Sequence, residues 1–284
     1  MSEQSTTSGK KFAPLNLSKE AIINYTPEWK GERFPDGRPK VSDDIIERMK
    51  EVTVEEAWGV LRGEGYEWQY EGGWECTEPG TPLVGRAVTA VYMPRREVMR
   101  ELIWDQAHEA GCVGGQVSWP IDTLVRGDVY VADVFGRIAD GPVVGSNLST
   151  SVFAKTGNGV VHDAAVRDLE KVKQIEGFNG FFRGYHPSAA SSTIMLMGIN
   201  APVRIGEVTV MPGDVILGKD EGVVFIPPHL AEKVVVTSEI VRLRDTFGEI
   251  RLKEGKYTPG EIDRRWTANI EEDFAQSVED HMDE

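Results

Sequence analysis

The chain has few of the residues and motifs that most directly mark a function. Its 284 residues include two cysteines and five histidines, with no CxxC or HExxH pattern. This excludes the simplest zinc-finger and zinc-protease sites. GxGxxG, P-loop and GxSxG elements are also missing, which excludes the simplest dinucleotide-binding, NTPase and α/β-hydrolase interpretations. We expect Cys76 and Cys112 to be reduced, structural thiols.

Positive charge and long apolar runs are scarce as well. The chain has 31 Lys plus Arg against 46 Asp plus Glu, a formal charge of −15. This balance argues against non-specific binding to nucleic acid or to an anionic membrane, since both need a basic surface. No apolar run approaches the roughly 18 residues of a membrane span, and the polar start MSEQSTTSGKKFAP lacks the apolar stretch of a secretory signal. We therefore expect a cytoplasmic protein that binds neither nucleic acid nor membrane.

The remaining composition is that of a globular protein, with 40% hydrophobic and 27% charged residues. We divide it into an extended N-terminal arm (1–41), an α/β domain (42–255) and a C-terminal extension (256–284). The acidic end of that extension, residues 271–284, is expected to be a solvated tail. The arm carries three aromatic anchors that we expect to clamp a neighbouring subunit: Tyr25, Trp29 and Phe34.

Apolar periodicity and capping residues predict the secondary structure. Helices are expected after Ser42, after the capping box of Thr53 and Glu56, and at 96–111, 147–157, 166–177 and 229–251. Short apolar runs between glycines predict buried strands at 83–93, 127–136, 159–164 and 201–227. The segment 66–82 is expected to be loop. Strands that alternate with helices indicate a mixed α/β fold.

The segment 157–170, GNGVVHDAAVRDLE, is the first candidate site. We expect a strand that ends at Asp163 and a short turn that brings Arg167 and Asp168 to the start of a helix. Ligands often bind at the carboxyl ends of strands in α/β proteins. Arg can grip a carboxylate bidentately, and Asp can hold a hard cation such as Mg²⁺. Alternatively, Arg167 and Asp168 simply pair with their neighbours.

The turn DGPVVGSNLST, residues 140–150, is the second candidate. Gly145, Ser146 and Asn147 precede a helix, so their backbone amides can form an anion site. The alternative is a plain N-cap, in which the side chain of Ser146 or Asn147 accepts hydrogen bonds from the amides of its own helix.

Two histidines are further candidates. His162 lies within the first candidate segment, and His186 lies in a later loop. His162 alternates with Asp163 on one strand, so only one of them can face a crevice, and we expect His162 to be packed in the core. His186 precedes Pro187 in a loop. It is a candidate for lining a pocket, although a structural loop position is the simpler interpretation.

Six segments, taken in order, resemble the RraA-like family: VGRAVTA, RGDVYVAD, GSNLST, GVVHDAAVRD, MPGDVILGKDEGVVFIP and RLKEG. The family includes 4-hydroxy-4-methyl-2-oxoglutarate/4-carboxy-4-hydroxy-2-oxoadipate aldolases and the regulator of ribonuclease activity A. The resemblance covers about residues 42–255. It implies a compact swivelling-type β/β/α domain that assembles as a homotrimer or homohexamer, with active sites between subunits.

The resemblance also implies roles for particular residues. Arg167 would hold the pyruvyl part of a substrate, and Asp168 would position Mg²⁺ or Mn²⁺. The backbone amides of Gly145–Leu148 would bind the substrate carboxylate. The metal ion would act as a Lewis acid that stabilises the enolate left by carbon–carbon cleavage. Asp245, or else Glu249, would come from the C-terminal helix of a neighbouring subunit.

Three positions depart from the family pattern. Ser146 stands where the family usually has an Asp that helps in proton transfer, and a hydroxyl cannot replace a carboxylate as base near pH 7. The usual glycine run has become Val134-Phe135-Gly136, and the Asp-Gly before the VRD turn has become Asp163-Ala164. The expected metal and substrate contacts are retained, whereas the proton donor is not identified.

The sequence thus predicts a divalent-metal-dependent lyase for a small anionic 2-oxo acid or hydroxy acid. The expected reaction is retro-aldol cleavage or oxaloacetate-type decarboxylation through a metal-stabilised enolate. One alternative is a sugar-acid dehydratase that uses the same metal site. Another is a non-catalytic, ring-shaped regulator that binds a protein partner. Retention of Arg167 and Asp168 favours catalysis, whereas Ser146 favours the regulator.

Overall fold

The structure is a computed structural model that describes the backbone of residues 15–282 and the side chains of residues 15–278. The beginning of the expected N-terminal arm (1–14) and the last residues of the expected acidic tail lie outside the described residues.

Helices and strands alternate through the middle of the chain, as the sequence predicts. The helices are α1 (Lys19–Tyr25), α2 (Asp43–Met49), α3 (Val54–Gly63), α4 (Glu97–Glu109), α5 (Trp119–Asp122), α6 (Ser146–Thr156), α7 (Leu169–Val172), α8 (Ala231–Lys253), α9 (Pro259–Ile262) and α10 (Ala268–Met282), with short 3₁₀ turns η1 (Ala190–Ser192) and η2 (Pro228–Leu230). The strands are β1 (Tyr70–Glu71), β2 (Glu75–Cys76), β3 (Leu83–Pro94), β4 (Asp128–Arg137), β5 (Val160–Val166), β6 (Gly180–Tyr185), β7 (Ile194–Ile199), β8 (Val203–Ile205), β9 (Val208–Val210), β10 (Val215–Lys219) and β11 (Gly222–Ile226).

One mixed sheet organises the described part of the chain. Its strands follow the order β1-β11-β10-β3-β4-β5-β6-β2, and β7 pairs with β3 beyond this path. Strands β3, β4, β5 and β6 are parallel, whereas β10, β11, β1, β2 and β7 pair antiparallel. Strands β8 and β9 form a separate hairpin. This arrangement confirms the α/β class, and the parallel centre brings the ends of β4, β5 and β6 to one edge.

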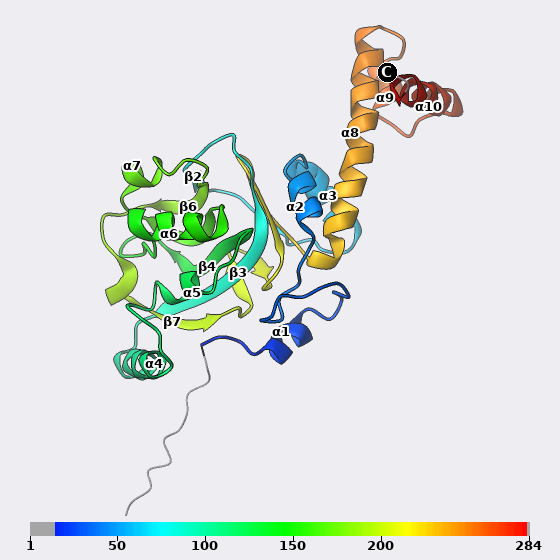
Figure 1. Ribbon diagram of the computed structural model, residues 1–284. Coiled ribbons are helices and arrows are strands. Elements are labelled where there is room, and N and C mark those ends of the chain that lie inside the picture. The colour runs from blue at the N-terminus through cyan, green and yellow to red at the C-terminus, as the bar shows by residue number, and fades with distance from the viewer. Residues whose placement is uncertain (1–14, 283–284) are drawn as a thin grey trace, which may run out of the picture.

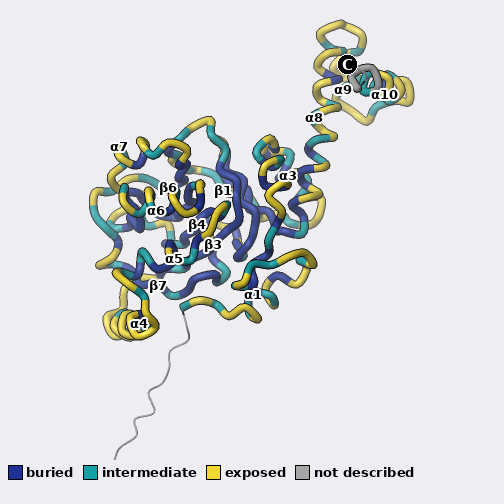
Figure 2. Tube along the Cα trace, in the orientation of Figure 1, coloured by how far each residue is buried: buried dark blue, intermediate teal, exposed yellow. Residues whose placement is uncertain are grey.

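Helices cover the sheet on both sides. In Figure 1, α5, α6 and α7 lie on one side of β3, and α2, α3 and the base of α8 lie on the other. One core cluster includes Val152 of α6 and Tyr130 of β4, and another includes Leu61 of α3 and Leu217 of β10. Every residue of β5 is buried, as expected for a strand covered on both faces. Figure 2 shows the buried sheet between more exposed helices.

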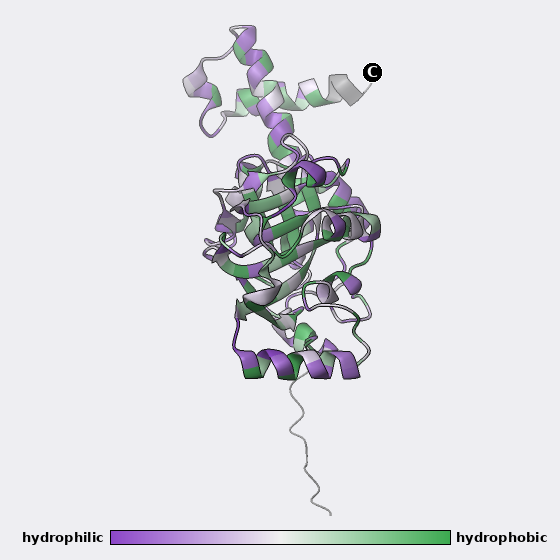
Figure 3. Ribbon diagram, turned by 90° about the vertical axis from the view of Figure 1, so that its left-hand side faces the viewer, coloured by the Kyte–Doolittle hydropathy of each residue, from purple (hydrophilic) through white to green (hydrophobic). Residues whose placement is uncertain are grey.

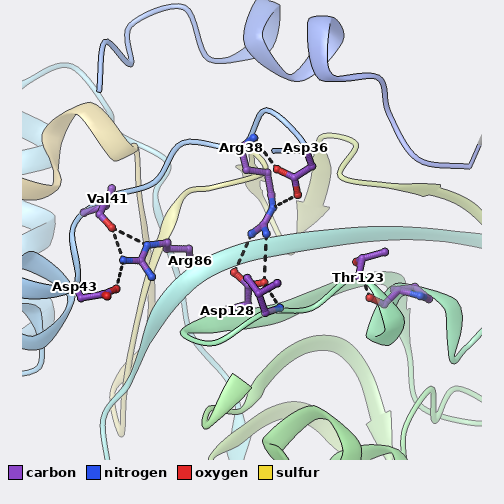
Figure 4. Close-up of polar contacts among 9 residues, drawn as sticks. Asp36, Arg38, Val41, Asp43, Arg86, Thr123 and Asp128 are labelled. Atoms are coloured by element: carbon purple, nitrogen blue, oxygen red, sulfur yellow. Dashed lines mark hydrogen bonds and ion pairs between the residues drawn. The ribbon is translucent and has the colours of Figure 1, made fainter. Parts of the chain in front are cut away.

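The N-terminal arm docks on its own domain. Arg38 is 1% exposed, and its Nη1 lies 2.9 Å from Oδ1 of the equally buried Asp128 at the start of β4. Asp36 holds Nε of the same guanidinium at 2.7 Å, as Figure 4 shows. Nearby, Nε of Arg86 donates to the carbonyl of Val41 at 2.7 Å. These contacts bind the arm to the sheet through groups that would be costly to bury unpaired.

The arm also differs from the expected extended segment. It contains α1, capped by Ser18, whose hydroxyl accepts from the amide of Ala21 at 3.2 Å. Trp29 packs against a core cluster of this same chain, and Phe34 lies under the guanidinium of Arg38 at 4.8 Å. Trp29 and Phe34 therefore have partners within their own chain.

The C-terminal helices project from the domain. Figures 1 and 3 show α8 extending beyond the sheet and carrying α9 and α10, at the opposite end from α4. Nη2 of Arg244 on α8 lies 2.8 Å from Oε1 of Glu271, and Nε of Arg251 lies 2.9 Å from Oδ2 of Asp273. The expectation of a solvated tail is therefore wrong for Glu271 and Asp273, which pair with arginines of α8, whereas Glu272 between them is exposed.

Local predictions succeeded where capping chemistry is explicit. The amide of Glu56 donates to Oγ1 of Thr53 at 3.2 Å, and the amide of Thr53 donates to Oε2 of Glu56 at 2.9 Å. This confirms the capping box of α3. Ser42 likewise caps α2, with its hydroxyl 3.3 Å from the amide of Ile45.

Other boundaries need correction. The segment 66–82 is not all loop, because it contributes the short strands β1 and β2. Strand β5 continues past Asp163 to Val166, because it follows β6 in parallel pairing up to Tyr185. The helix expected at 166–177 is only the four-residue α7.

Two further expectations concern the whole chain. No helix within residues 15–282 combines the length and apolarity needed to cross a membrane. Cys76 and Cys112 are both free, as expected. Burial raises the pKa of the Cys76 thiol, which keeps it in the unreactive protonated form.

Candidate functional site

The two candidate segments meet at one edge of the sheet. Arg167 and Asp168 directly follow β5, and Gly145 and Ser146 begin α6. The amide of Arg167 lies 3.4 Å from the carbonyl of Val144, so the two backbones run side by side here. Parallel pairing between β4 and β5 explains the meeting, because the segments after both strands emerge at the same edge.

Asp168 supplies the cap of α6. Its Oδ2 accepts a hydrogen bond from the amide of Ser146 at 3.2 Å and from the hydroxyl of Ser146 at 3.4 Å. The helix has no side-chain cap of its own, because Gly145 occupies the N-cap position. The plain N-cap interpretation of this turn is therefore wrong. A carboxylate from another loop lies where the helix dipole favours negative charge.

The backbone of Asp168 is also unusual. Its φ of 56° and ψ of 34° place it in the left-handed region. Asp and Asn tolerate this conformation better than other residues with a Cβ. The conformation ends β5 and starts α7, so the carboxylate leaves the chain at a sharp turn.

Arg167 lies beside this carboxylate but does not form a hydrogen bond with it. Its Nε is 4.0 Å from Oδ2 of Asp168, longer than a hydrogen bond. The two side chains are 44% and 42% exposed. A purely structural ion pair would tie both groups together, whereas here both remain open to a ligand.

Gly145 makes the close approach possible. A Cβ at this position would lie 2.6 Å from Oδ2 of Asp168 and 2.9 Å from Nε of Arg167. Both distances are too short for a real side chain. Only glycine therefore lets the start of α6 lie directly against the Arg167–Asp168 pair.

The pair lines a pocket of about 220 Å³. The opposite wall comes from the segment after β6 and includes Tyr185 and His186. His186, for which a structural loop position was the simpler interpretation, thus lies in the same pocket as Arg167 and Asp168. A signal was present: a His-Pro pair follows a strand that emerges at the same edge as β5.

Several contacts hold Nδ1 of His186. The hydroxyl of Ser188 lies 2.8 Å from it, and which of the two atoms donates depends on the tautomer of the imidazole. The amides of Asp140 and Ser188 lie at 3.3 and 3.4 Å from the same nitrogen. Nε2 has no partner among the described residues, so it is available to a ligand in the pocket.

His162 has the packed position that the sequence predicts. Its ring lies edge-on between Tyr130 and Phe182, with centroids 4.6 and 5.7 Å away. Burial lowers the pKa of His162 to about 3, so it is neutral near pH 7. Its neighbour Asp163 accepts from Nε of Arg183 at 2.6 Å.

The other expected residues divide into two places. Asn147 and Leu148 lie in the first turn of α6, where backbone amides have no partner within the helix. Asp245 is exposed on α8, as is Glu249. Figure 1 shows α8 on the opposite side of the sheet from α6. Within one chain, neither acid on α8 joins the Arg167 pocket.

The carboxylate oxygen available here fits a metal ion whose other ligands are water and substrate oxygens. Among the described residues there is no group of three His, Cys, Asp or Glu side chains that could form a complete metal site. Mg²⁺ often uses only one or two protein carboxylates, with water and substrate oxygens completing its shell. Oδ1 of Asp168 has no partner among the described residues, so it is free to serve as such a ligand.

Comparisons with known proteins agree with this architecture. The family model described as RraA-like, Aldolase/RraA, matches residues 41–225. Protein DlpA of Legionella pneumophila is 28% identical over 178 residues, which are 62% of this chain and 27% of that protein. A protein of Halalkalibacterium halodurans, named a candidate 4-hydroxy-4-methyl-2-oxoglutarate aldolase, is 37% identical over 112 residues, 38% of this chain and 50% of that protein. The chain thus spans half or less of the length of these two relatives.

A solved structure shares the fold. RraAS2 of Streptomyces coelicolor, described as an unusual member of the RNase ES inhibitor RraA protein family, aligns with a TM-score of 0.61 and 24% identity. The alignment covers 75% of this chain and 98% of that one. At this sequence identity the structural similarity supports a shared fold and nothing further.

Proposed function

The chain belongs to the RraA-like family, and on this premise we propose that it is a divalent-metal-dependent lyase for a small 2-oxo acid or hydroxy acid. The family includes aldolases and ribonuclease regulators. The proposed reaction is retro-aldol cleavage, or decarboxylation of an oxaloacetate-type acid. One observation carries the proposal: the carboxylate of Asp168 is presented at the start of α6, beside an equally open Arg167.

In this proposal Asp168 holds Mg²⁺ or Mn²⁺ through its free Oδ1. When bound, the ion supplies Lewis-acid stabilisation of the charge that develops on a 2-oxo acid as a carbon–carbon bond breaks. Arg167 grips the substrate carboxylate with its guanidinium fork. The amides of Asn147 and Leu148 donate to the same carboxylate, since the first turn of a helix favours anions.

We assign proton transfer to His186. The hydroxyl of Ser146 has no suitable pKa for this task, and it already lies 3.4 Å from Asp168. His186 lines the same pocket, where its Nε2 has no partner among the described residues, while its Nδ1 contacts Ser188 and the amide of Asp140. The assignment supplies the proton donor that the departure at Ser146 leaves open.

We further propose a homotrimer or homohexamer in which Asp245, or else Glu249, approaches the Arg167 pocket of a neighbouring subunit. The projection of α8 beyond its own domain supports this arrangement. It is tested by the mass of the native assembly and by mixing inactive Asp168→Asn chains with inactive Asp245→Asn chains. Shared sites predict recovered activity in the mixture, whereas self-contained sites predict none.

A non-catalytic regulator is the second candidate, and the uncharged Ser146 favours it. Melting temperature with Mg²⁺ plus oxalate or pyruvate discriminates the two. A lyase site is stabilised in proportion to ligand saturation, whereas a pure protein-binding ring does not respond. We also propose a cytoplasmic location, on the basis of the acidic composition and the two free cysteines.

The direct test of the reaction is a panel of 4-hydroxy-2-oxo acids, oxaloacetate and sugar acids, followed by proton NMR. Formation of pyruvate from a member of the first two groups supports carbon–carbon cleavage. Water loss from a sugar acid would instead assign the dehydratase. No turnover of any compound would overturn the lyase proposal.

A further inference from the structure

A second and larger pocket lies where the N-terminal arm crosses the end of the sheet. Its volume is about 450 Å³, against about 220 Å³ for the Arg167 pocket, and the two share no lining residue. One wall is the arm segment 24–29, and the other comes from residues beside α3, β9, β10 and η2. The volume is within the range of small-molecule sites.

Aromatic side chains from both walls line this pocket. Tyr25 and Trp29 come from the arm, and Tyr66 comes from the segment after α3. The hydroxyl of Tyr66 lies 3.3 Å from Nε2 of His229, and their ring centroids are 5.8 Å apart. Such rings offer faces that attract a cation.

The charged groups of the lining are acidic. Glu28 comes from the arm and Asp214 from the turn before β10, and the described residues of the lining include no Lys or Arg. Asp214 is 3% exposed. Its Oδ2 accepts from the amide of Met211 at 2.8 Å, and its Oδ1 has no partner among the described residues. The pocket therefore contains a buried carboxyl group without a cation beside it.

Asp128 shows what the chain does with a buried carboxylate elsewhere. That residue is as buried as Asp214 but is held by the guanidinium of Arg38. The turn formed by Met211 and Asp214 provides a hydrogen bond to only one carboxyl oxygen of Asp214. The remaining oxygen has no hydrogen-bond partner among the described residues, although the side chain is buried, and this points to a partner from outside the chain.

We propose that this pocket binds a small organic cation, a quaternary ammonium compound or an amine. Trp29, Tyr25 and Tyr66 would provide the aromatic faces, and Glu28 and Asp214 would provide the negative charge. An anionic ligand is disfavoured because His229 is the only basic residue in the lining that the structure describes. The site is independent of the proposed lyase chemistry.

The ionisation of Asp214 adds a signature that can be tested. Burial raises the pKa of Asp214 to about 8, so it keeps its proton near pH 7 when alone. Burial, and then the nearby carboxylates of Glu28 and Asp214, raise the pKa of Tyr66, so both acidic groups lie near this phenol, and Nε2 of His229 contacts its hydroxyl. A bound cation favours the carboxylate, so binding releases a proton and strengthens as pH rises toward 8.

Choline and its neutral isostere 3,3-dimethylbutan-1-ol form the matched test on the full chain. Isothermal titration at pH 8 should detect choline and give an affinity about tenfold or more above that of the alcohol, because only choline carries the charge. Equal affinities, or no binding of either compound up to the solubility of the alcohol, would overturn the proposal.

Variants then locate the binding. Glu28→Gln and Trp29→Leu should each weaken choline binding about three- to tenfold, while Trp58→Leu, on the exposed face of α3, should leave it unchanged. Of these two variants, Glu28→Gln should disturb folding less, because Glu28 is exposed. Undiminished binding in folded Glu28→Gln and Trp29→Leu proteins would place choline elsewhere and overturn the assignment.

The pH dependence of the choline affinity tests the role of Asp214. Choline keeps its charge at all pH values, so its affinity reports the protein groups alone. The affinity should rise from pH 6 to 8 in the parent and in His229→Gln, and become flat in Asp214→Asn combined with His229→Gln. An affinity that does not rise in the parent would contradict the role of Asp214.

Discussion

The amide of Ser146 donates a 3.2 Å hydrogen bond to Oδ2 of Asp168, 22 residues further along the chain. This contact joins the start of α6 to the end of β5. It orients the carboxylate and leaves its other oxygen open. In the proposed lyase, the helix thus positions the metal-binding group rather than binding an anion at every amide of its first turn.

Gly145→Ala should strongly lower activity with little loss of stability. The new Cβ would lie 2.6 Å from the carboxylate of Asp168, but both neighbouring side chains are exposed and can move away. We expect turnover to fall by about 100-fold, as for other small displacements of catalytic groups, with a melting temperature near that of the parent. Gly260→Ala is the control, because that glycine has open space around it. Full activity in Gly145→Ala would contradict the tight packing of this site.

His186→Gln should lower kcat while leaving substrate affinity largely intact. Glutamine keeps a hydrogen-bonding group but cannot exchange a proton near pH 7, so we expect a loss of about 10²- to 10⁴-fold. His108→Gln, at an exposed position on α4, is the matched control. An unchanged kcat in His186→Gln would assign proton transfer to another group.

Arg38→Met should destabilise the fold strongly. It removes the cation from the buried Asp128, and breaking such a pair costs about 3–5 kcal/mol. Arg48→Met removes a solvent-exposed pair with Glu239, and because water screens this pair, the loss of stability should be far smaller. Urea unfolding of both variants measures the difference. Equal losses would show that the arm contributes little to the domain.

His162 should make the protein less stable in acid. Its folded pKa of about 3 lies below the ordinary value of 6.5, so between these values only the unfolded chain binds the proton. Its contribution is complete above pH 6.5 and falls by up to about 1.4 kcal/mol per pH unit below it. In His162→Leu this part of the slope should vanish, whereas His108→Gln should retain it. The free energy of unfolding at pH 7, 6, 5 and 4 gives the comparison.

Features encoded by neighbouring residues were predictable. The capping box of Thr53 and Glu56 needs only a four-residue pattern, and the apolar run of β3 needs only its own composition. Arg167 and Asp168 were selected as site residues because of the family resemblance and because they follow a predicted strand. Their contact with Gly145 was implicit in that resemblance, but its geometry was not.

Features that depend on distant partners could not be predicted in the same way. Strand β6 reads GFFRGY, with two glycines and a charge, and it forms a strand because β5 and β2 pair with it. Arg38 looks like an ordinary arm residue until Asp128, 90 residues away, neutralises it in the core. Glu271 and Asp273 of α10 look solvated in the sequence, but arginines of α8 pair with them.

The central claim is that Asp168 holds a metal ion which activates a 2-oxo acid. Exchange of the methyl protons of pyruvate in D₂O, followed by proton NMR, tests it without knowledge of the natural substrate. Asp168→Asn is a suitable variant because Asn tolerates the left-handed backbone and can still accept from the amide of Ser146. The account predicts exchange with Mg²⁺ that disappears with EDTA and in Asp168→Asn. Exchange that persists in folded Asp168→Asn, or no exchange by the parent with Mg²⁺, would contradict it.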